Sequence, residues 1–212
     1  MLKKIYYFLL KILSKSKDRG QPSSGIWQEL VRKTVFNLVA NEKGKILEIG
    51  CGEGLFLKKF EGNFNKIVGI DISFEQLKRA RQVCKDFYLI QANALQLPFK
   101  DNIFNTVICI NFFLNLSSEE KVNSILEEIK RVSTKKAKFI FEIRNRKSPL
   151  IILKYKTAKY YDNTVRYLRT FCYEDFKEKL DVLNFKIKKR INLGFPKGEF
   201  SPIILIEAIK DD

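Results

Sequence analysis

Three glycines at two-residue intervals follow a short apolar segment, and this is the stretch with the clearest chemical meaning. Residues 46–54 read Ile-Leu-Glu-Ile-Gly-Cys-Gly-Glu-Gly, which predicts a buried strand that enters a tight turn. Glycine tolerates positive φ and lacks a Cβ atom, so the backbone of such a turn can approach a ligand closely. A helix is expected over 54–60, and the first N–H groups of a helix are unpaired. We therefore expect a ligand at Gly50, Gly52 and Gly54.

A carboxylate follows this turn at a spacing that suits binding. Asp71 lies seventeen residues after Gly54, at the end of the next apolar segment. In nucleotide-binding α/β folds, an acid at that place accepts hydrogen bonds from ribose hydroxyls. A dinucleotide-binding domain and a turn without a ligand remain alternatives, although the G-x-G-x-G spacing differs from the dinucleotide G-x-G-x-x-G.

The segments that must position these residues alternate between strand and helix periodicity. Strands are expected over 45–49, 66–70, 87–91, 106–110 and 138–143, and helices over 26–40, 54–60, 74–84 and 119–132. A helix over 173–183 and strands over 185–190 and 203–209 follow. The last two strands are joined by turn residues without room for a crossover, so they should pair antiparallel. The prediction is an α/β fold: a Rossmann-like, seven-stranded, mostly parallel sheet with an antiparallel last strand and helices on both faces.

The segment from about Lys45 to Ile143 resembles the class I S-adenosylmethionine-dependent methyltransferases, specifically their small-molecule and lipid group known as methyltransferase type 11. The first motif of that group is E-x-G-x-G-x-G, which is present at 48–54. Residues 92–99 (ANALQLPF) are similar to its G-D-A-x-x-L-P-F segment, and 101–107 (DNIFNTV) to D-x-x-F-D-x-V. Residues 126–132 are similar to the helix before its fifth strand.

The resemblance implies S-adenosylmethionine as cofactor. Glu48 and the backbone of the glycine turn would hold its methionine part, Asp71 its ribose, Ile72 the face of its adenine, and Asn93 with Ala94 the adenine edge. The implied cofactor-binding set is Glu48, Gly50, Cys51, Gly52, Gly54, Asp71, Ile72, Asn93, Ala94 and Asn111. Two departures are visible: Asn93 replaces an Asp, and residues 133–137 (STKKA) replace an L-K-P-G-G turn.

The acceptor side is expected at the carboxyl ends of the fourth and fifth strands. Methyl transfer from a sulfonium mainly requires alignment of the reacting groups, so no single residue must be catalytic. The candidates are Asn111, Phe112, Phe113, Glu142, Arg144, Asn145 and Arg146, with the two phenylalanines expected in the core rather than on an acceptor platform. Residues 111–114 lack the N/D-P-P-Y/F motif of amino-group methyltransferases that act on adenine or glutamine.

Composition excludes several other chemistries. The chain has 212 residues and no histidine, so imidazole general bases, histidine triads and histidine metal sites are absent. Its four cysteines are far apart and form no C-x-x-C pair. We therefore expect reduced thiols, no metal site and a cytoplasmic protein.

Positive charge is concentrated in two segments. The formal net charge is +16; residues 1–20 hold six basic residues and one acidic, and residues 130–190 hold nineteen and six, which leaves the remainder nearly neutral. The second segment also contains Tyr155, Tyr160, Tyr161 and Tyr167. Such a mixture suits a phosphate-bearing acceptor or nucleic acid, and a lysine-rich composition alone would produce a similar surface.

We divide the chain into a basic amphipathic helix with a linker (1–25) and a methyltransferase domain (26–212), whose segment at about 144–172 would form the acceptor side. Residues 1–17 are too short to span a bilayer and would either contact an anionic membrane surface or pack on the domain. The expected function is methyl transfer to a small or lipid-linked, anionic acceptor, peripheral to a membrane. The alternatives are a tRNA methyltransferase and a non-catalytic, cofactor-binding partner subunit. The oligomeric state stays open.

Overall fold

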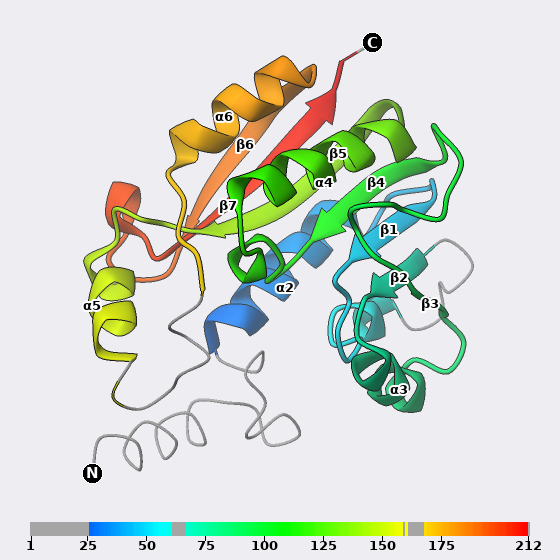
Figure 1. Cartoon of the computed structure of the whole chain (residues 1–212), viewed down its shortest axis with the longest axis horizontal. Helices are drawn as coiled ribbons and strands as arrows, with labels where there is room; N and C mark the ends of the chain where they lie inside the picture. The colour runs from blue at the N-terminus through cyan, green and yellow to red at the C-terminus, as the bar shows by residue number, and fades with distance from the viewer. Residues whose placement is uncertain (1–25, 61–66, 159, 161–167, 212) are drawn as a thin grey trace.

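The computed structural model describes residues 26–60, 67–158, 160 and 168–211. The expected helix and linker over 1–25, with the membrane contact of 1–17, lie outside these ranges. The sheet has seven strands in the order β3-β2-β1-β4-β5-β7-β6 (Figure 1). Strands β1 to β5 are parallel neighbours, whereas β7 is antiparallel to both β5 and β6, as predicted. The strands are β1 (Ile46–Ile49), β2 (Ile67–Asp71), β3 (Tyr88–Gln91), β4 (Phe104–Cys109), β5 (Ser133–Arg144), β6 (Phe185–Leu193) and β7 (Ile203–Lys210).

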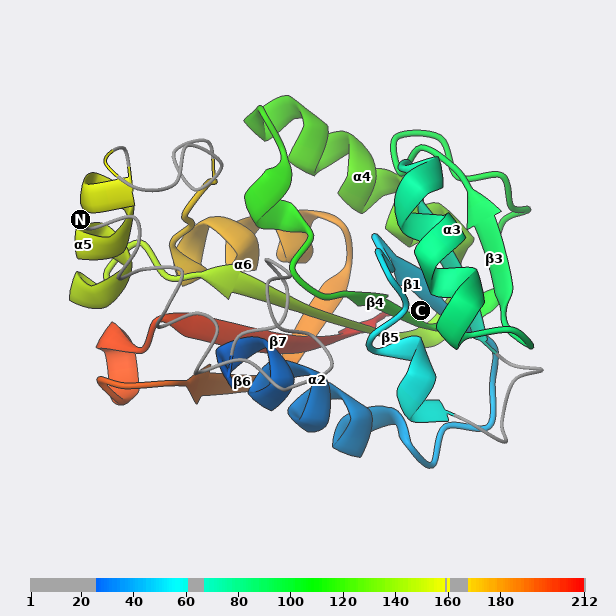
Figure 2. The ribbon, with the colours of Figure 1, turned by 90° about the horizontal axis from the view of Figure 1, so that it is seen from below.

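Helices cover both faces of the sheet, which confirms the predicted layers (Figure 2). Helices α4 (Glu119–Val132) and α6 (Tyr173–Val182) lie on one face, and α2 (Ile26–Val39) lies on the other. Helix α3 (Phe74–Val83) follows β2, and α5 (Pro149–Ala158) follows β5. Within the described ranges, no helix has the length and apolarity needed to cross a bilayer.

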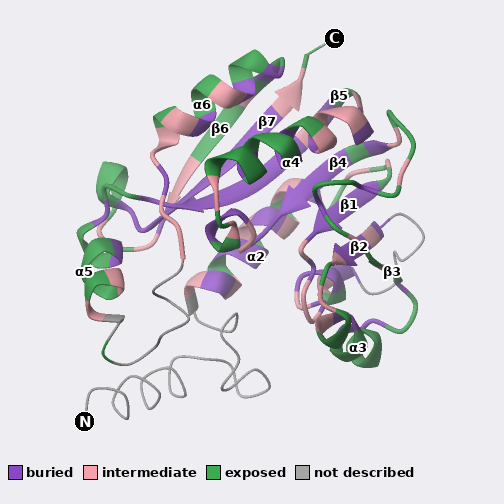
Figure 3. Ribbon diagram, viewed as in Figure 1, coloured by how far each residue is buried: buried purple, intermediate pink, exposed green. Residues whose placement is uncertain are grey.

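Two apolar clusters, one on each face, hold these layers together. Side chains alternate along β1, so Leu47 and Ile49 join the cluster under α4 and α6, whereas Ile46 joins the cluster under α2. Much of the phenylalanine content lies in the first cluster, where the fully buried Phe113 makes edge contacts with Phe139, Phe141 and Phe176. Figure 3 shows the central strands as buried and the outer faces of the helices as exposed.

The predicted helix over 54–60 is wrong. The chain forms only a short 3-10 helix, η1 (Leu57–Phe60). Gly54 has a φ of +75°, outside the helical region, so a regular helix cannot begin there. In a 3-10 helix residues three apart lie on the same side, and this geometry buries both Leu57 and Phe60.

Two further elements differ from the prediction. Strand β5 begins at Ser133, directly after α4, so residues 133–137 belong to the strand rather than to a separate turn. Lys136 has a φ of 59°, and the pairing of β5 with β4 shifts in register between Phe104 and Thr106. Helix α5 was not predicted, because its apolar residues surround the helix and show no clear helical period.

Candidate functional site

The glycine turn is held against β2 by backbone hydrogen bonds. The N–H groups of Gly50 and Cys51 both donate to the carbonyl oxygen of Ile70, at 2.8 and 2.9 Å, and the N–H of Gly54 donates to the carbonyl of Cys51 at 2.9 Å. All three glycines have positive φ, between +53° and +75°. The turn therefore has the left-handed backbone that its glycines make accessible.

The three glycines serve different purposes. A Cβ atom on Gly50 would lie 2.6 Å from Cδ2 of Phe112, and one on Gly54 would lie 2.8 Å from Sγ of Cys84. A Cβ atom on Gly52 would meet nothing within 4 Å. Gly54 thus permits packing against α3, while Gly52 borders open space. The neighbouring Cys51 is buried, and burial raises the pKa of its thiol.

Asp71 ties the end of β2 to the glycine turn. Its Oδ2 accepts a hydrogen bond from the N–H of Gly52, and its Oδ1 accepts one from the N–H of Ser73, both at 2.9 Å. Ser73 in turn caps α3 by accepting from the N–H of Gln76. Each carboxylate oxygen has more than one acceptor position, so Asp71 retains capacity for a ligand hydroxyl.

Glu48 lies beneath the turn as a buried, incompletely satisfied carboxylate. Its side chain is 3% exposed, and its Oε2 has no hydrogen-bond partner in the described part of the chain. Burial raises the pKa of Glu48 to about 8; the nearby Arg32 of α2 opposes this rise and Asp71 adds to it. A buried carboxyl group in this condition would be ionised readily by a ligand that brings a positive charge.

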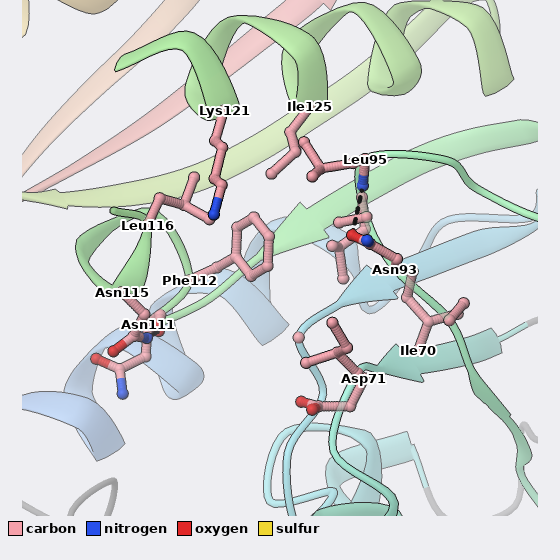
Figure 4. A pocket seen from close by; sticks show the side chains of 15 residues that line it. Ile70, Asp71, Asn93, Leu95, Asn111, Phe112, Asn115, Leu116, Lys121 and Ile125 are labelled. Atoms are coloured by element: carbon pink, nitrogen blue, oxygen red, sulfur yellow. Dashed lines mark hydrogen bonds between the residues drawn. The ribbon is translucent and has the colours of Figure 1, made fainter. Parts of the chain in front are cut away.

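A cavity of about 320 Å³ lies at the carboxyl edge of the sheet (Figure 4). Asp71 stands at one side of it, and Phe112 with the first turns of α4 at the other. This edge, between the strands on either side of β1, is where open α/β sheets bind ligands. The lining residues are Ile49, Gly50, Ile70, Asp71, Ile72, Ala92, Asn93, Ala94, Leu95, Asn111, Phe112, Asn115, Leu116, Lys121 and Ile125.

One wall of the cavity is apolar and suits a flat ring. Ile72 lines the cavity and is 66% exposed, so its side chain is available to cover the face of a bound ring. Asn93 accepts a hydrogen bond at Oδ1 from the N–H of Leu95, at 3.0 Å. Its second acceptor position and its Nδ2 donors are left for a ligand.

Asn111 connects the cavity with a buried polar cluster. Its backbone N–H donates to Oε1 of Glu142 at 2.9 Å, and its Oδ1 accepts from Nη2 of Arg144 at 3.0 Å. Its carbonyl oxygen accepts from Nδ2 of Asn115 at 2.7 Å. The bond from Arg144 sets the orientation of the Asn111 amide, because only its oxygen can accept from a guanidinium. The amide nitrogen is thereby left as the donor.

Glu142 and Arg144 complete this cluster from β5. Arg144 Nη1 donates to Glu142 Oε2 at 2.7 Å, and Glu142 is 1% exposed. Tyr155 of α5 lies close to both charges, and its pKa is raised by burial, with opposing contributions from Arg144 and Glu142. The sequence predicted that Asn111, Glu142 and Arg144 lie on one side of the site, and the structure joins them by hydrogen bonds.

Other acceptor-side candidates are engaged elsewhere. Asn145 is buried, and its Nδ2 donates to the carbonyl oxygens of Glu199 and Ser201. Arg146 faces Asp175 at 3.7 Å, and Phe113 is a core residue, as expected. Phe112, which we also expected in the core, is partly buried and packs against it, and it also lines the cavity and covers Gly50.

The sequence did not single out Asn115, Leu116, Lys121 and Ile125 as site residues. Lys121 is the most informative of them, because Figure 4 shows its ammonium group directed toward the cavity, beside Phe112 and Leu116. No ion pair of Lys121 is present among the described residues. In the sequence it is one lysine of an amphipathic helix, and only the position of α4 over the sheet identifies it.

The residues present fit S-adenosylmethionine. The unpaired Glu48 oxygen matches an ammonium group, Asp71 matches ribose hydroxyls, and Ile72 matches the face of a purine. When bound, this cofactor supplies an electrophilic methyl group on a positively charged sulfur. In this arrangement the carboxylates of the chain would hold the polar groups of the cofactor, and an apolar wall would cover its purine.

Comparisons with known proteins agree with this fit. Residues 47–141 match the family model of a methyltransferase domain. The ubiquinone/menaquinone biosynthesis C-methyltransferase UbiE of Wigglesworthia glossinidia brevipalpis is 33% identical over 115 residues, covering 50% of this chain and 45% of that protein. The phosphatidylethanolamine N-methyltransferase of Cereibacter sphaeroides is 29% identical over 139 residues, covering 62% of this chain and 66% of that protein. The chain spans less than half the length of several curated relatives that it matches.

Among solved structures, the N-methyltransferase NodS of Bradyrhizobium japonicum WM9, in complex with S-adenosyl-L-homocysteine, has the same fold. The TM-score is 0.70 at 14% identity, over 97% of this chain and 98% of that one. The fold and the carboxyl-edge cavity thus define a Rossmann-like, ligand-binding α/β protein. Within that class, residues 47–141 match a methyltransferase domain, and the chain has the fold of the class I S-adenosylmethionine-dependent methyltransferases.

Proposed function

We propose that the chain transfers a methyl group from S-adenosylmethionine to a small or lipid-linked, anionic acceptor. The observation that carries this proposal is the fixed amide of Asn111. Arg144 holds its oxygen, so its nitrogen is the free hydrogen-bond donor of a side chain that lines the cavity. A hydrogen-bond donor there suits an acceptor with oxygen atoms that carry negative charge, such as a carboxylate or a phosphate.

Lys121 supports the same choice of acceptor. Its ammonium group extends toward the cavity (Figure 4), where it would attract an anion. Arg144 itself is a poor candidate for direct anion binding, because its charge is balanced by Glu142 at 2.7 Å. Arg144 therefore acts in this proposal as a positioning residue for Asn111, while Asn111 and Lys121 would contact the acceptor.

A lipid-linked acceptor is supported by one relative. The Cereibacter sphaeroides protein is named for methylation of phosphatidylethanolamine, a phosphate-bearing lipid. The other similar proteins are named for different acceptors, including malonyl-[acyl-carrier protein]. These acceptors are compatible with a pocket that has both apolar and cationic side chains.

The tRNA alternative is less favoured by the contacts of the basic segment. Arg146, Lys147 and Arg169 all face carboxylates, namely Asp175 at 3.7 Å, Glu174 at 3.4 Å and Glu119 at 2.9 Å. Cations that are already paired release fewer counterions from a nucleic-acid backbone. The formal net charge therefore overstates the unpaired positive charge that is available to bind RNA.

The test is transfer of a labelled methyl group to separated cell fractions: lipids, small anionic metabolites and tRNA. We expect label in the lipid or small-metabolite fraction. In protein that circular dichroism shows to be folded, Arg144→Ala should lower transfer at least about tenfold while the affinity for S-adenosylhomocysteine changes less than about twofold. Lys130→Ala, on α4 but outside the cavity lining, is the control. Label only in tRNA would support the nucleic-acid alternative, and tight cofactor binding without transfer to any fraction would support the non-catalytic one.

A further inference from the structure

Helix α5 is apolar on its outer side although it lies at the surface of the domain. Ile151 is buried and Tyr155, one turn later, is half-buried, so these two residues face the domain. On the other side, Leu150, Ile152 and Leu153 are 42%, 41% and 62% exposed. A surface helix of a globular domain normally turns polar residues outward. The exposed apolar residues on the outer side of α5 therefore indicate a binding surface.

The connection between β6 and β7 adds a second exposed apolar group at the same end of the sheet. It contains η5 (Gly198–Phe200), and it exposes Phe195 by 75% and Phe200 by 53%. The Asn145 amide holds this connection to the end of β5, just before α5 begins. Figures 1 and 2 both place η5 and α5 at this end. We call Leu150, Ile152, Leu153, Phe195 and Phe200 together the α5–η5 surface.

Positive charge borders this surface. No acidic residue occurs between Arg144 and Ala158. Lys154 and Lys156 are exposed on α5, and Lys197 is exposed in the β6–β7 connection. Glu199 is the single acidic residue of the two segments 149–158 and 194–202. Leucine and phenylalanine side chains surrounded by lysines suit the headgroup and acyl boundary of an anionic bilayer.

We propose that the α5–η5 surface binds the interface of an anionic phospholipid bilayer. The proposal deepens the proposed function and rests on it, since a lipid-linked acceptor would be presented at that interface. Helix α5 lies between the proposed lipid-binding surface and the polar cluster of Glu142 and Arg144. Its outer side would face lipid, while Tyr155 on its inner side lies beside Arg144 and Glu142. An acceptor headgroup that enters past α5 would thus reach the polar cluster that holds Asn111.

The test is co-sedimentation of the full chain with vesicles of equal phosphatidylglycerol and phosphatidylcholine, and with phosphatidylcholine alone. We expect binding to the anionic vesicles and weak binding to the neutral ones. Leu153→Glu and Phe195→Glu should each weaken vesicle binding by about fivefold or more, because each replaces an inserted apolar side chain by a charge. Val182→Glu, which alters a 79% exposed residue at the end of α6, is the matched control. Circular dichroism checks that each variant is folded.

Full vesicle binding by the Leu153→Glu/Phe195→Glu double variant would overturn the proposal and shift attention to residues 1–17. Loss of a dimer in the same variant, seen by light scattering without vesicles, would assign the surface to a second copy and also overturn it. Methyl transfer is measured separately, with a detergent-dispersed lipid acceptor. If the proposed function fails, the chain binds vesicles but labels no lipid; if the surface is wrong, lipid is labelled but the variants bind vesicles like the wild type.

Discussion

Arg144 Nη1 lies 2.7 Å from Glu142 Oε2, and this ion pair is enclosed in the domain: the two side chains are 10% and 0% exposed. Glu142 also accepts from the N–H of Asn111 through its other oxygen. The pair thus satisfies a buried backbone donor and sets the orientation of an amide at the cavity. Removal of one partner of this pair should be strongly destabilising, because the other charge is then buried without compensation.

Glu142→Ala should therefore destabilise the domain by about 3–5 kcal/mol. The substitution leaves the Arg144 guanidinium unpaired and the N–H of Asn111 without its acceptor. Urea unfolding monitored by circular dichroism measures the change. Glu174→Ala, which removes an exposed partner of Lys147, should stay within about 0.5 kcal/mol of the wild type. Equal effects of the two substitutions would refute a buried role for Glu142.

Asp71→Ala should weaken the binding of S-adenosylhomocysteine by about 1.5–3 kcal/mol. The variant loses the carboxylate expected to hold the ribose, and it also frees the N–H of Gly52 that Asp71 positions. Isothermal titration calorimetry measures the affinity. Asp86→Ala, at an exposed position after α3, is the control and should bind as the wild type does. An unchanged affinity of the Asp71 variant would remove this residue from the cofactor site.

Glu48 predicts a pH dependence of the ligand-free domain. Its pKa is raised from 4.5 to about 8, so between these values the folded chain binds more protons than the unfolded chain. Stability must then fall as pH rises through this window, by up to about 1.4 kcal/mol per pH unit from this group. Glu48→Gln, which resembles the protonated form, should abolish this fall. The difference in unfolding free energy between the two proteins, measured from pH 5 to pH 8, isolates the Glu48 contribution.

The same group predicts proton release on ligand binding. Near pH 7, Glu48 is mostly protonated in the free domain, and a bound ammonium group would favour its ionised form. Titration of S-adenosylhomocysteine in buffers of different ionisation enthalpy should therefore detect release of up to about one proton. The release should disappear in Glu48→Gln. Its persistence in that variant would place the titrating group elsewhere.

Gly50→Ala should mainly lower stability, whereas Gly52→Ala should mainly lower the affinity for the ligand. Both positions have positive φ, which costs a non-glycine residue about 1 kcal/mol. Gly50→Ala adds a Cβ atom 2.6 Å from the Phe112 ring, so it should lose the larger amount of stability, by about 1–3 kcal/mol more. Gly52→Ala should fold well but bind S-adenosylhomocysteine poorly, because its Cβ atom would occupy open space that we expect the ligand to fill. Thermal unfolding and calorimetry on both variants separate these effects, with Gly198→Ala as the control for backbone strain alone.

Local patterns in the sequence were sufficient for the order of most elements and for the glycine turn, whereas the cofactor was implied by the family resemblance. Glycines that need positive φ, strands with their own periodicity and an acid at the end of the second strand are all short-range signals. They failed at 54–60, where Gly54 interrupts the helix start, and at α5, whose apolar residues show no period. Neither failure affects the position of Asp71 or of the turn.

The tertiary structure determines how the residues proposed for the acceptor side are arranged. Asn111 and Arg144 are distant in sequence and meet because β4 and β5 pair in parallel, with Cys109 opposite Phe141. Asn145 instead bonds to the β6–β7 connection, which the antiparallel pairing of β5 with β7 brings beside it. Lys121 reaches the cavity because α4 begins at the carboxyl edge of the sheet and Lys121 lies in its first turn. Charge balance, amide orientation and exposure depend on neighbours from other strands and helices, and a linear sequence does not specify those neighbours.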